Sequence, residues 1–563
     1  MADIGYISLF LALLASGYSA IAYLFGVRRE HSALLASARN SLFTAFGFLT
    51  VAAGALLYGL ITRDFQVEYI ASYTSRDLSL LFTISAWWAG NAGSLLFWAW
   101  LLSLLAVIMV VQRREMGKEL VPYAAAVVMI TQVFFVVLML GVANPFHKLS
   151  FVPPDGRGLN PLLENEGMLF HPLTLLTGYV GFTIPFAFAI AALLTRRLGD
   201  EWLVVVRRWT LFAWIMLSLG NLFGAWWAYV ELGWGGYWGW DPVENASLMP
   251  WLTGTAFLHS IMMQRRRGIL KKWNMVLIIV TFALAIFGTF LTRSGVLASV
   301  HTFSESNIGY YYLVFISLTL LISFSLLWYR SPELKSEAEI EALVSRESTF
   351  LLNNLLIVGA AFAVFIGVIF PILSEWVRGV KITVGPPFYD QVNGPIFIAI
   401  VALAGICTLI GWRQATVKNL VHNFFAPAAI AVVAAVLLFV AGIRQVYAFV
   451  PLAICAFVFA TIFSEWMRGT FARHRTKGEN YLKAFFGLVA ANRPRYGGYI
   501  VHIGIVLLAI GVIGSKFYAI EKEVTLNPGQ SSTIGQYTIT YDNIDSFETA
   551  SRTTVMTSLS VYN

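Results

Sequence analysis

A tryptophan- and glycine-rich stretch carries the residues of this sequence best suited to holding a flat molecule. Residues 234–252 read WGGYWGWDPVENASLMPWL and contain four tryptophans and three glycines. Indole faces offer large flat apolar contacts, and glycine lets a planar ligand approach the backbone closely. We therefore predict a platform for a planar ligand that consists of Trp234, Gly235, Gly236, Tyr237, Trp238 and Trp240. The alternative is a belt of interfacial aromatic residues, which gather at both surfaces of a membrane.

Two carboxylates follow the tryptophans, and the sequence leaves two roles open for them. Asp241 precedes a proline, and this order is typical of a helix that begins with an aspartate cap and a proline in its first position. Asp241 and Glu244 could instead orient imidazole rings as hydrogen-bond partners of metal-ligating histidines. We include both residues in the predicted platform.

His171 and His301 are predicted to lie at the two sides of this platform. His171 opens an apolar run in MLFHPLTLL, and His301 lies in the loop segment RSGVLASVHTF. If the outer ends of neighbouring helices cluster, both imidazoles lie beside the aromatic floor. Two imidazoles around a flat floor are what axial coordination of a heme iron requires. The alternative for each residue is an ordinary surface histidine.

His259 and His502 form a second predicted pair, inside apolar helices. His259 lies six residues before Arg265, and His502 lies seven residues after Arg495. At about 1.5 Å per helical residue, both lie about 9–11 Å from the cytoplasmic boundary, although their helices run in opposite directions. Ionisable residues inside membrane spans are costly and usually functional. The pair could bind a buried b-type heme, or both could be core histidines that are hydrogen-bonded to neighbouring helices.

Two arginines are candidates for binding the propionate groups of a heme. Arg157 lies in PPDGRGLN and Arg293 in LTRSG, both predicted to be external. A guanidinium binds carboxylates through two parallel hydrogen bonds. Contact with lipid headgroups is the alternative for both.

The composition places these residues in a polytopic membrane protein. Of the 563 residues, 58% are hydrophobic and only 12% are charged. Apolar runs long enough to span a bilayer predict about fourteen transmembrane helices, one of them near 249–264. Roughly 27 of the 38 Lys and Arg residues lie in alternate loops, which predicts that these loops are cytoplasmic and that the N-terminus and the platform face outward. The net charge of +8 therefore reflects membrane orientation and does not indicate a nucleic-acid partner.

The chain is predicted to have two parts. Residues 1–518 form an all-α transmembrane domain that includes the external tryptophan-rich loop 226–250. Residues 519–563 contain QYTITY and TTVMTSLSVY, which alternate apolar and polar positions and predict a small external β-rich domain, expected to be incomplete. We find no pattern of a cleavable signal peptide and no CxxC or CxxCH motif.

Several segments together resemble one known family. WGGYWGWDP resembles the WWD signature of proteins that handle heme. DGRGLNPLLENEGMLFHP, GTFLTRSGVLASVH and NRPRYGGYIVH extend the similarity over nearly the whole chain to the cytochrome c maturation protein F (CcmF) family. Residues 88–94 read WAGNAGS where a pattern nearer W-G-G-x-E-G-S is expected, so the resemblance assigns this segment no specific role.

The resemblance implies a heme lyase of cytochrome c biogenesis in the bacterial cytoplasmic (inner) membrane. It also implies a fifteenth transmembrane helix in a longer chain. His171 and His301 match the external pair that ligates substrate heme, and His259 and His502 match the pair that holds a buried heme b. The implied partners are a heme chaperone, apocytochrome c with its CxxCH motif, an apocytochrome-handling maturation subunit, thioredoxin-like proteins and a quinol as electron source. No catalytic residue can be assigned beyond the platform. The alternative is a heme transporter or loading protein of the same superfamily without catalysis.

Overall fold

The structure, a computed structural model, describes residues 1–112, 117–232, 236–297, 307–338, 342, 344–410, 417–548 and 553–563. Most of these residues are helical, and a small sheet follows the last helix. The contacts between residues divide the chain into two compact units, and each is described by itself.

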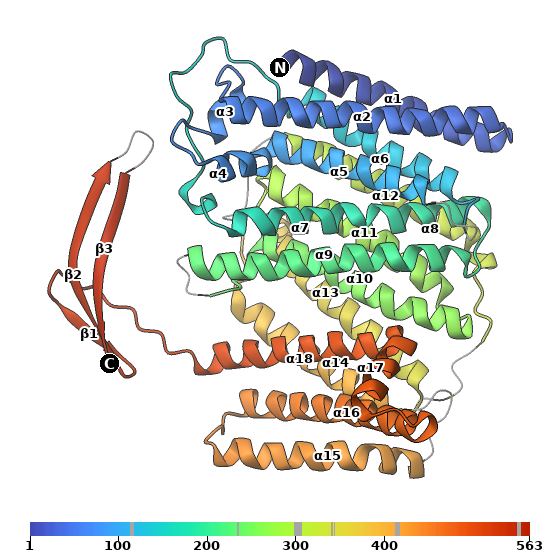
Figure 1. The fold of residues 1–563 in the computed structure, drawn as a ribbon, viewed down its shortest axis with the longest axis vertical. Coiled ribbons are helices and arrows are strands. Elements are labelled where there is room, and N and C mark those ends of the chain that lie inside the picture. Colours follow the sequence, from blue (N-terminus) through green and yellow to red (C-terminus); the bar gives the residue numbers. More distant parts are fainter. Residues whose placement is uncertain are drawn as a thin grey trace. The chain divides into compact units, whose positions relative to one another are not determined.

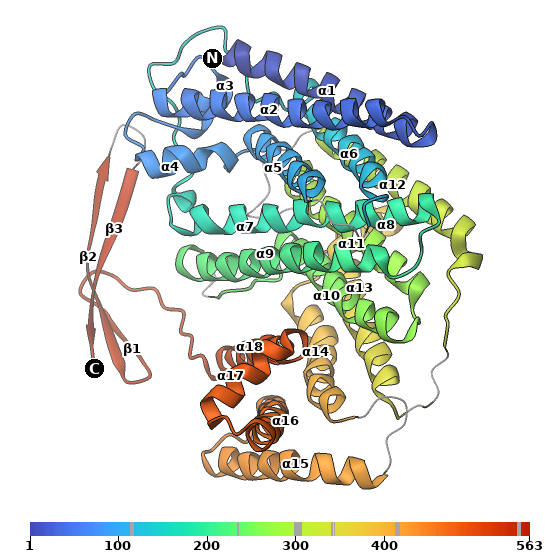
Figure 2. The same cartoon turned by 45° about the vertical axis from the view of Figure 1, so that its right-hand side comes forward.

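The first unit comprises Met1–Glu339 and Ile357–Asn393. Its helices are α1 (Ala2–Arg28), α2 (Ser32–Thr62), α3 (Glu68–Tyr73), α4 (Leu80–Ser85), η1 (Ala86–Trp88), α5 (Asn91–Val111), α6 (Val121–Gly141), η2 (Pro161–Leu163), α7 (Gly167–Gly181), α8 (Thr183–Thr195), α9 (Glu201–Glu231), α10 (Pro242–Arg267), α11 (Lys271–Ser294), α12 (Ile308–Arg330) and η3 (Ser331–Glu333). Figures 1 and 2 both show α1 lying along α2 and α7 lying along α9. The core of this unit includes the fully buried side chains of Trp98, Trp202 and Phe257.

The second unit comprises Ile340–Leu356 and Gly394–Asn563. Two helices have one end in each unit, namely α13 (Arg346–Arg378) and α14 (Pro386–Leu409). The other elements of this unit are α15 (Val417–Val440), α16 (Val446–Lys477), α17 (Tyr481–Ala491), α18 (Arg493–Tyr518), β1 (Ser531–Ile534), β2 (Tyr537–Glu548) and β3 (Thr553–Tyr562). Its core forms where α16 meets α18, around the buried Cys455, Tyr496 and Val506.

The predicted polytopic helical architecture is confirmed. Within the described residues, thirteen helical stretches are long and apolar enough to cross a membrane, and α7 and α8 together form one of them. The predicted span near 249–264 corresponds to α10, which has 26 residues but is not among the thirteen. Histidine, serine and threonine residues make α10 less apolar than the other spans. With α10, the thirteen stretches match the fourteen predicted helices.

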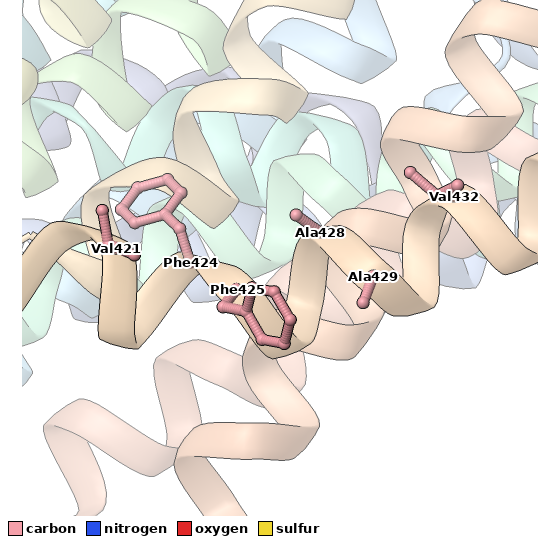
Figure 3. Close-up of a pocket in the computed structure, with 6 residues that line it drawn as sticks. All are labelled: Val421, Phe424, Phe425, Ala428, Ala429 and Val432. Carbon is pink, nitrogen blue, oxygen red and sulfur yellow. The ribbon is translucent and has the colours of Figure 1, made fainter.

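Helix α15 shows the kind of surface that the apolar composition creates. Figure 3 shows an open pocket on this helix that only apolar side chains line: Val421, Phe424, Phe425, Ala428, Ala429 and Val432. They recur at helical spacing and so share one face of the helix. Such a face suits contact with lipid chains, because it carries no polar group that would have to leave water.

The predicted β-rich C-terminal part is confirmed as a three-stranded antiparallel sheet in the order β1-β2-β3. β1 pairs with β2 from Ser531 opposite Thr540 to Ile534 opposite Tyr537. β2 pairs with β3 along its length, with a shift of register between Tyr541 and Asn543. Most side chains of β2 and β3 are exposed, so this sheet has little core of its own.

Candidate heme-binding site

The described part of the platform, residues 236–241 and Glu244, is joined to the start of α10 by hydrogen bonds. Asp241 caps the helix by accepting a hydrogen bond from the backbone N–H of Val243, at 2.9 Å. Glu244 Oε2 accepts from the backbone N–H groups of Gly239, at 2.9 Å, and Asp241, at 3.2 Å. Both carboxylates thus take part in a capping box, which satisfies N–H groups that the helix itself leaves unpaired. The arrangement supports the capping role among the two that the sequence leaves open.

Two tryptophans of the platform lie at right angles. The rings of Trp238 and Trp240 have centroids 5.9 Å apart and planes at 89°. Trp240 has a φ of +55°, a left-handed conformation that is costly for a residue with a Cβ atom. Trp234 and Gly235 lie outside the described residues.

His171 lies in the first turns of α7 and is oriented by α9. Its Nδ1 is 2.8 Å from the backbone oxygen of Gly220. A carbonyl oxygen can only accept, so Nδ1 carries the proton and Nε2 carries the lone pair in the neutral ring. The imidazole also lies beside Trp227, with ring centroids 5.8 Å apart. Trp227 is near the end of α9, which leads directly into the platform loop.

His259 lies on α10. Like His171, it carries its proton on Nδ1, but the acceptor oxygen belongs to its own helix. Its Nδ1 is 2.8 Å from the backbone oxygen of Thr255, one turn earlier in the same helix. The hydroxyl of Thr255 accepts a hydrogen bond of 2.8 Å from Trp214 Nε1 of α9. Nδ1 of His259 therefore donates, and Nε2 carries the lone pair that a metal ion requires.

The support of His259 belongs to a longer row of contacts between α9 and α10. Trp214 stacks on Trp251, with centroids 5.8 Å apart and planes at 20°. Trp251 Nε1 donates to Ser218 Oγ at 2.7 Å, and Ser247 Oγ donates to Asn221 Oδ1 at 2.5 Å. On α10 the contributing residues are spaced by four, at 247, 251, 255 and 259, so they share one face of the helix. This row runs from near the capped start of α10 down to His259.

The other two predicted histidines belong to other parts of the chain. His301 lies outside the described residues. His502 lies on α18 of the second unit and is half-buried. The pairing of His259 with His502 and of His171 with His301 remains a prediction. Each porphyrin supplies four iron ligands itself, so one or two imidazoles are enough to complete a heme site.

The two candidate arginines lie in different environments. Arg157 is exposed, and its backbone N–H donates to the Ala71 oxygen at 2.7 Å. Arg293 is only 1% exposed, and its Nη2 donates to Ser94 Oγ of α5 at 3.0 Å. The exposed side chain of Arg157 fits the predicted contact with an external propionate. The buried side chain of Arg293 joins α11 to α5.

The segment at residues 88–94, to which the sequence assigned no role, joins several elements of the first unit together with the two residues before it. Trp88 Nε1 donates to the Met168 oxygen at 2.9 Å, three residues before His171. The Tyr69 hydroxyl donates to the Ala86 oxygen at 2.8 Å and accepts from the backbone N–H of Gly90 at 3.0 Å. Burial of this hydroxyl raises the pKa of Tyr69 well above its ordinary value. The segment therefore connects the beginning of α7 with that of α5.

Several residues of this site were missed by sequence reasoning. Gly220, Trp214 and Thr255 orient the two histidines, yet none of them belongs to a recognisable motif. One signal was available, because polar and aromatic residues recur every fourth position before His259 on α10. The partners on α9 left no such signal, since their role depends on which helices are neighbours.

Comparison with known proteins gives one consistent result. A family model described as cytochrome C assembly protein matches residues 88–297. The chain is 35% identical over 547 residues to the cytochrome c-type biogenesis protein CcmF of Haemophilus influenzae, covering 97% of this chain and 83% of that protein. It is 36% identical to CcmF of Pseudomonas aeruginosa, covering 96% of this chain and 81% of that protein. A solved structure of the cytochrome c heme lyase CcmF superposes with a TM-score of 0.81 at 30% identity, over 100% of this chain and 85% of the other.

Proposed function

Because the chain belongs to the CcmF family of cytochrome c-type biogenesis proteins, we propose that it is a heme lyase that attaches heme to apocytochrome c. Substrate heme, delivered by a heme chaperone, binds at the external platform with His171 and His301 as iron ligands. A second heme, of b type, would be held by His259 and His502 as iron ligands. The function rests on the orientation of the imidazoles more than on any acid or base.

The observation that carries this proposal is the hydrogen bond between Nδ1 and a backbone oxygen at His171 and at His259. His171 and His259 both donate from Nδ1 to a backbone carbonyl oxygen, at 2.8 Å in each case. The other ring nitrogen, Nε2, then carries the lone pair, which is the form in which imidazole ligates iron. Two unrelated contacts thus produce the same ligand chemistry at both predicted heme positions.

Thioether formation needs positioning rather than an elaborate catalytic group. Each cysteine thiol of a CxxCH motif adds across one vinyl group of the substrate heme, so that a C–S bond forms and the proton goes to the neighbouring vinyl carbon. No atom is lost and no net oxidation occurs. The chain must hold the porphyrin in one orientation while the apocytochrome approaches. His171, Trp227 and the capped platform are the described groups that can do this.

A heme b held by His259 and His502 would supply the electrons that keep the iron of the substrate heme reduced, with a quinol as their source. For this role the chain needs a ligand that stays neutral and fixed in a medium of low polarity. The hydrogen bond from His259 to Thr255, and that from Trp214 to the same threonine, meet this need. They hold the ring and its proton without placing a charged group near it.

We further propose that the chain lies in the bacterial cytoplasmic membrane with the platform and the N-terminus outside. Helix α10 begins at the platform and ends with Arg265, Arg266 and Arg267. Helices α1, α12 and α16 also end with basic residues. Because basic residues favour the cytoplasmic side, the basic end of α10 supports a platform on the opposite, external face. There it would meet apocytochrome c, the apocytochrome-handling subunit and thioredoxin-like proteins.

Two alanine variants test the assignment. Each is expressed in full length together with the other maturation components and a reporter apocytochrome c. His171→Ala should reduce covalent heme on the reporter, measured after denaturing electrophoresis, by at least tenfold while the purified chain keeps its heme b spectrum. His259→Ala should remove the low-spin bis-histidine signal. The matched control is His147→Ala, because His147 is exposed and ligates nothing in the proposal.

Two results would contradict the proposal. An unchanged visible spectrum in His259→Ala would exclude this residue as a heme b ligand. Full covalent attachment in His171→Ala would exclude the external ligand role. Heme binding at the platform with no thioether formation in a complete maturation system would favour the alternative of a loading protein.

A further inference from the structure

We propose that Tyr389 and Asp390, at the start of α14, are positioning residues that lock the heme platform through Trp240. No sequence motif connects these residues with the tryptophan-rich loop. This inference rests on the proposed function, because it concerns how the platform keeps the shape that heme binding needs.

The backbone of Trp240 needs external support. Its φ of +55° lies in the left-handed region, where the Cβ atom of an ordinary residue is crowded. Such conformations persist only when surrounding contacts fix them, and they cluster at functional sites. Trp240 directly precedes Asp241, the cap of α10. The backbone conformation of Trp240 therefore sets the direction from which the loop enters the helix.

The required support comes from a distant part of the first unit. The Trp240 ring stacks on Tyr389, with centroids 4.8 Å apart and planes only 7° from parallel. Trp240 Nε1 donates to Asp390 Oδ1 at 3.1 Å, across 150 residues of sequence. Asn245 Nδ2 donates to the backbone oxygen of Trp240 at 2.9 Å. Ring, indole N–H and carbonyl are thus each held by a different partner.

Tyr389 is itself rigidly placed. It is 2% exposed, and Gly367 of α13 leaves the space that its ring occupies. A Cβ atom at Gly367 would lie 2.6 Å from Cε1 and from the hydroxyl oxygen of Tyr389. Helix α13 and the first turn of α14 therefore provide a fixed surface against which Trp240 rests.

The lock changes the role of Trp240 in the platform. One face of its indole is covered by Tyr389, so this face is not available to a porphyrin. Trp238 lies edge-on to Trp240 at 89°, so the orientation of Trp238 depends on Trp240. Trp240 acts as the anchor, and Tyr389 and Asp390 set the plane that the rest of the platform presents.

The first test measures the lock without any heme at the platform. Hydrogen–deuterium exchange of the purified full chain is followed in peptides that cover residues 236–245. Tyr389→Leu and Asp390→Ala should each speed exchange there at least tenfold. Once the loop can move, the amides of Gly239 and Asp241 no longer stay hydrogen-bonded to Glu244. Tyr389→Phe and Asp390→Asn keep the ring and an acceptor oxygen and should change exchange less than twofold. The matched controls are Tyr310→Leu, at a 73% exposed position, and Asp200→Ala, at a helix start without a side-chain cap.

The second test titrates hemin into the same preparations and follows the Soret band. Tyr389→Leu and Asp390→Ala should weaken hemin binding at least tenfold, and Tyr389→Phe and Asp390→Asn should restore it. The heme b spectrum should stay unchanged in all of them, which shows that the helical fold is intact.

The results separate the lock from the proposed function. Unchanged exchange in Tyr389→Leu and Asp390→Ala overturns the lock. Faster exchange with unaltered hemin binding overturns its role in shaping the platform for heme. Weaker hemin binding without faster exchange also overturns it, because the two residues would then contact heme directly. If hemin binds equally well to His171→Ala, the proposed ligand role fails, and the exchange data still decide whether the lock exists.

Discussion

His171 and His259 reach the same tautomer through opposite structural means. The acceptor for His171 is a backbone oxygen of another helix, α9, whereas the acceptor for His259 belongs to its own helix. The first contact requires two helices to approach closely. The second requires only a regular helix, with Trp214 as an added support from the neighbouring helix.

The close approach at His171 depends on glycines. A Cβ atom at Gly220 would lie 2.7 Å from the Cα atom of Leu175 on α7, and one at Gly178 would lie 2.6 Å from the Leu217 backbone nitrogen. Small residues at such crossings let helix backbones pack closely inside membranes. The position of His171 is therefore determined by available space, and that of His259 by hydrogen bonds. The two sites should respond differently to added methyl groups and to deleted polar groups.

The largest effect is expected from Gly224→Ala. The added Cβ would lie 2.6 Å from Nδ1 and Cε1 of His171, so the imidazole must leave its present position. Overpacking of this kind costs about 1–3 kcal/mol and would break the contact with Gly220. We expect at least a tenfold loss of covalent heme on a reporter cytochrome, with heme b retained.

A matched glycine provides the control for this variant. Gly54→Ala on α2 adds the same methyl group where nothing lies within 4 Å. It should leave both covalent heme and heme b unchanged. Equal activity of the Gly224→Ala and Gly54→Ala chains would show that the position of His171 does not depend on the space that Gly224 leaves for its ring.

A smaller effect is expected from Trp214→Phe at the other histidine. The substitution keeps an aromatic ring against Trp251 but removes the hydrogen bond to Thr255 Oγ1. Loss of one such bond costs about 1 kcal/mol, so the affinity for heme b should fall by a factor of about five. The loss of affinity is measured as the amount of heme b per purified chain and as the strength of its low-spin electron paramagnetic resonance signal. Trp226→Phe, at an exposed position of α9, is the control. Full heme content in Trp214→Phe would mean that the hydrogen bond within α10 is sufficient.

The contrast between the two histidines also shows what the sequence could predict. The spans follow from long apolar runs, because a membrane-crossing helix needs a minimum length of apolar residues. His259 could be selected because a histidine inside such a helix is costly. His171 could be selected because it opens an apolar run whose outer end was expected beside the tryptophan-rich loop. The α10 start could be predicted from Asp241 and Pro242, since capping is a local interaction that the structure contains.

Other parts of the site could not be predicted because they depend on tertiary neighbours. Gly224 matters only because α7 packs against α9 at that level, and Tyr389 only because the start of α14 reaches Trp240. Neither relation leaves a periodic or local pattern in the sequence. Arg293 illustrates the same point, since its position near a predicted external end gave no sign that it is buried against α5.

The smallest effect is expected from Ser218→Ala. This variant tests whether the Trp214–Thr255 contact supports His259 alone or together with the other hydrogen bonds between α9 and α10. Ser218→Ala removes the acceptor of Trp251 Nε1, one turn away from the Trp214–Thr255 contact. Because Trp251 would still stack on Trp214, the support of His259 should survive, and heme b content should change less than twofold. Val230→Ala, at an exposed position on the same helix, controls for a mere loss of side-chain volume. A loss as large as that in Trp214→Phe would mean that the hydrogen bonds between α9 and α10 act as one cooperative network. In that case both histidines would depend on the packing of α9, and the difference between them would be one of degree.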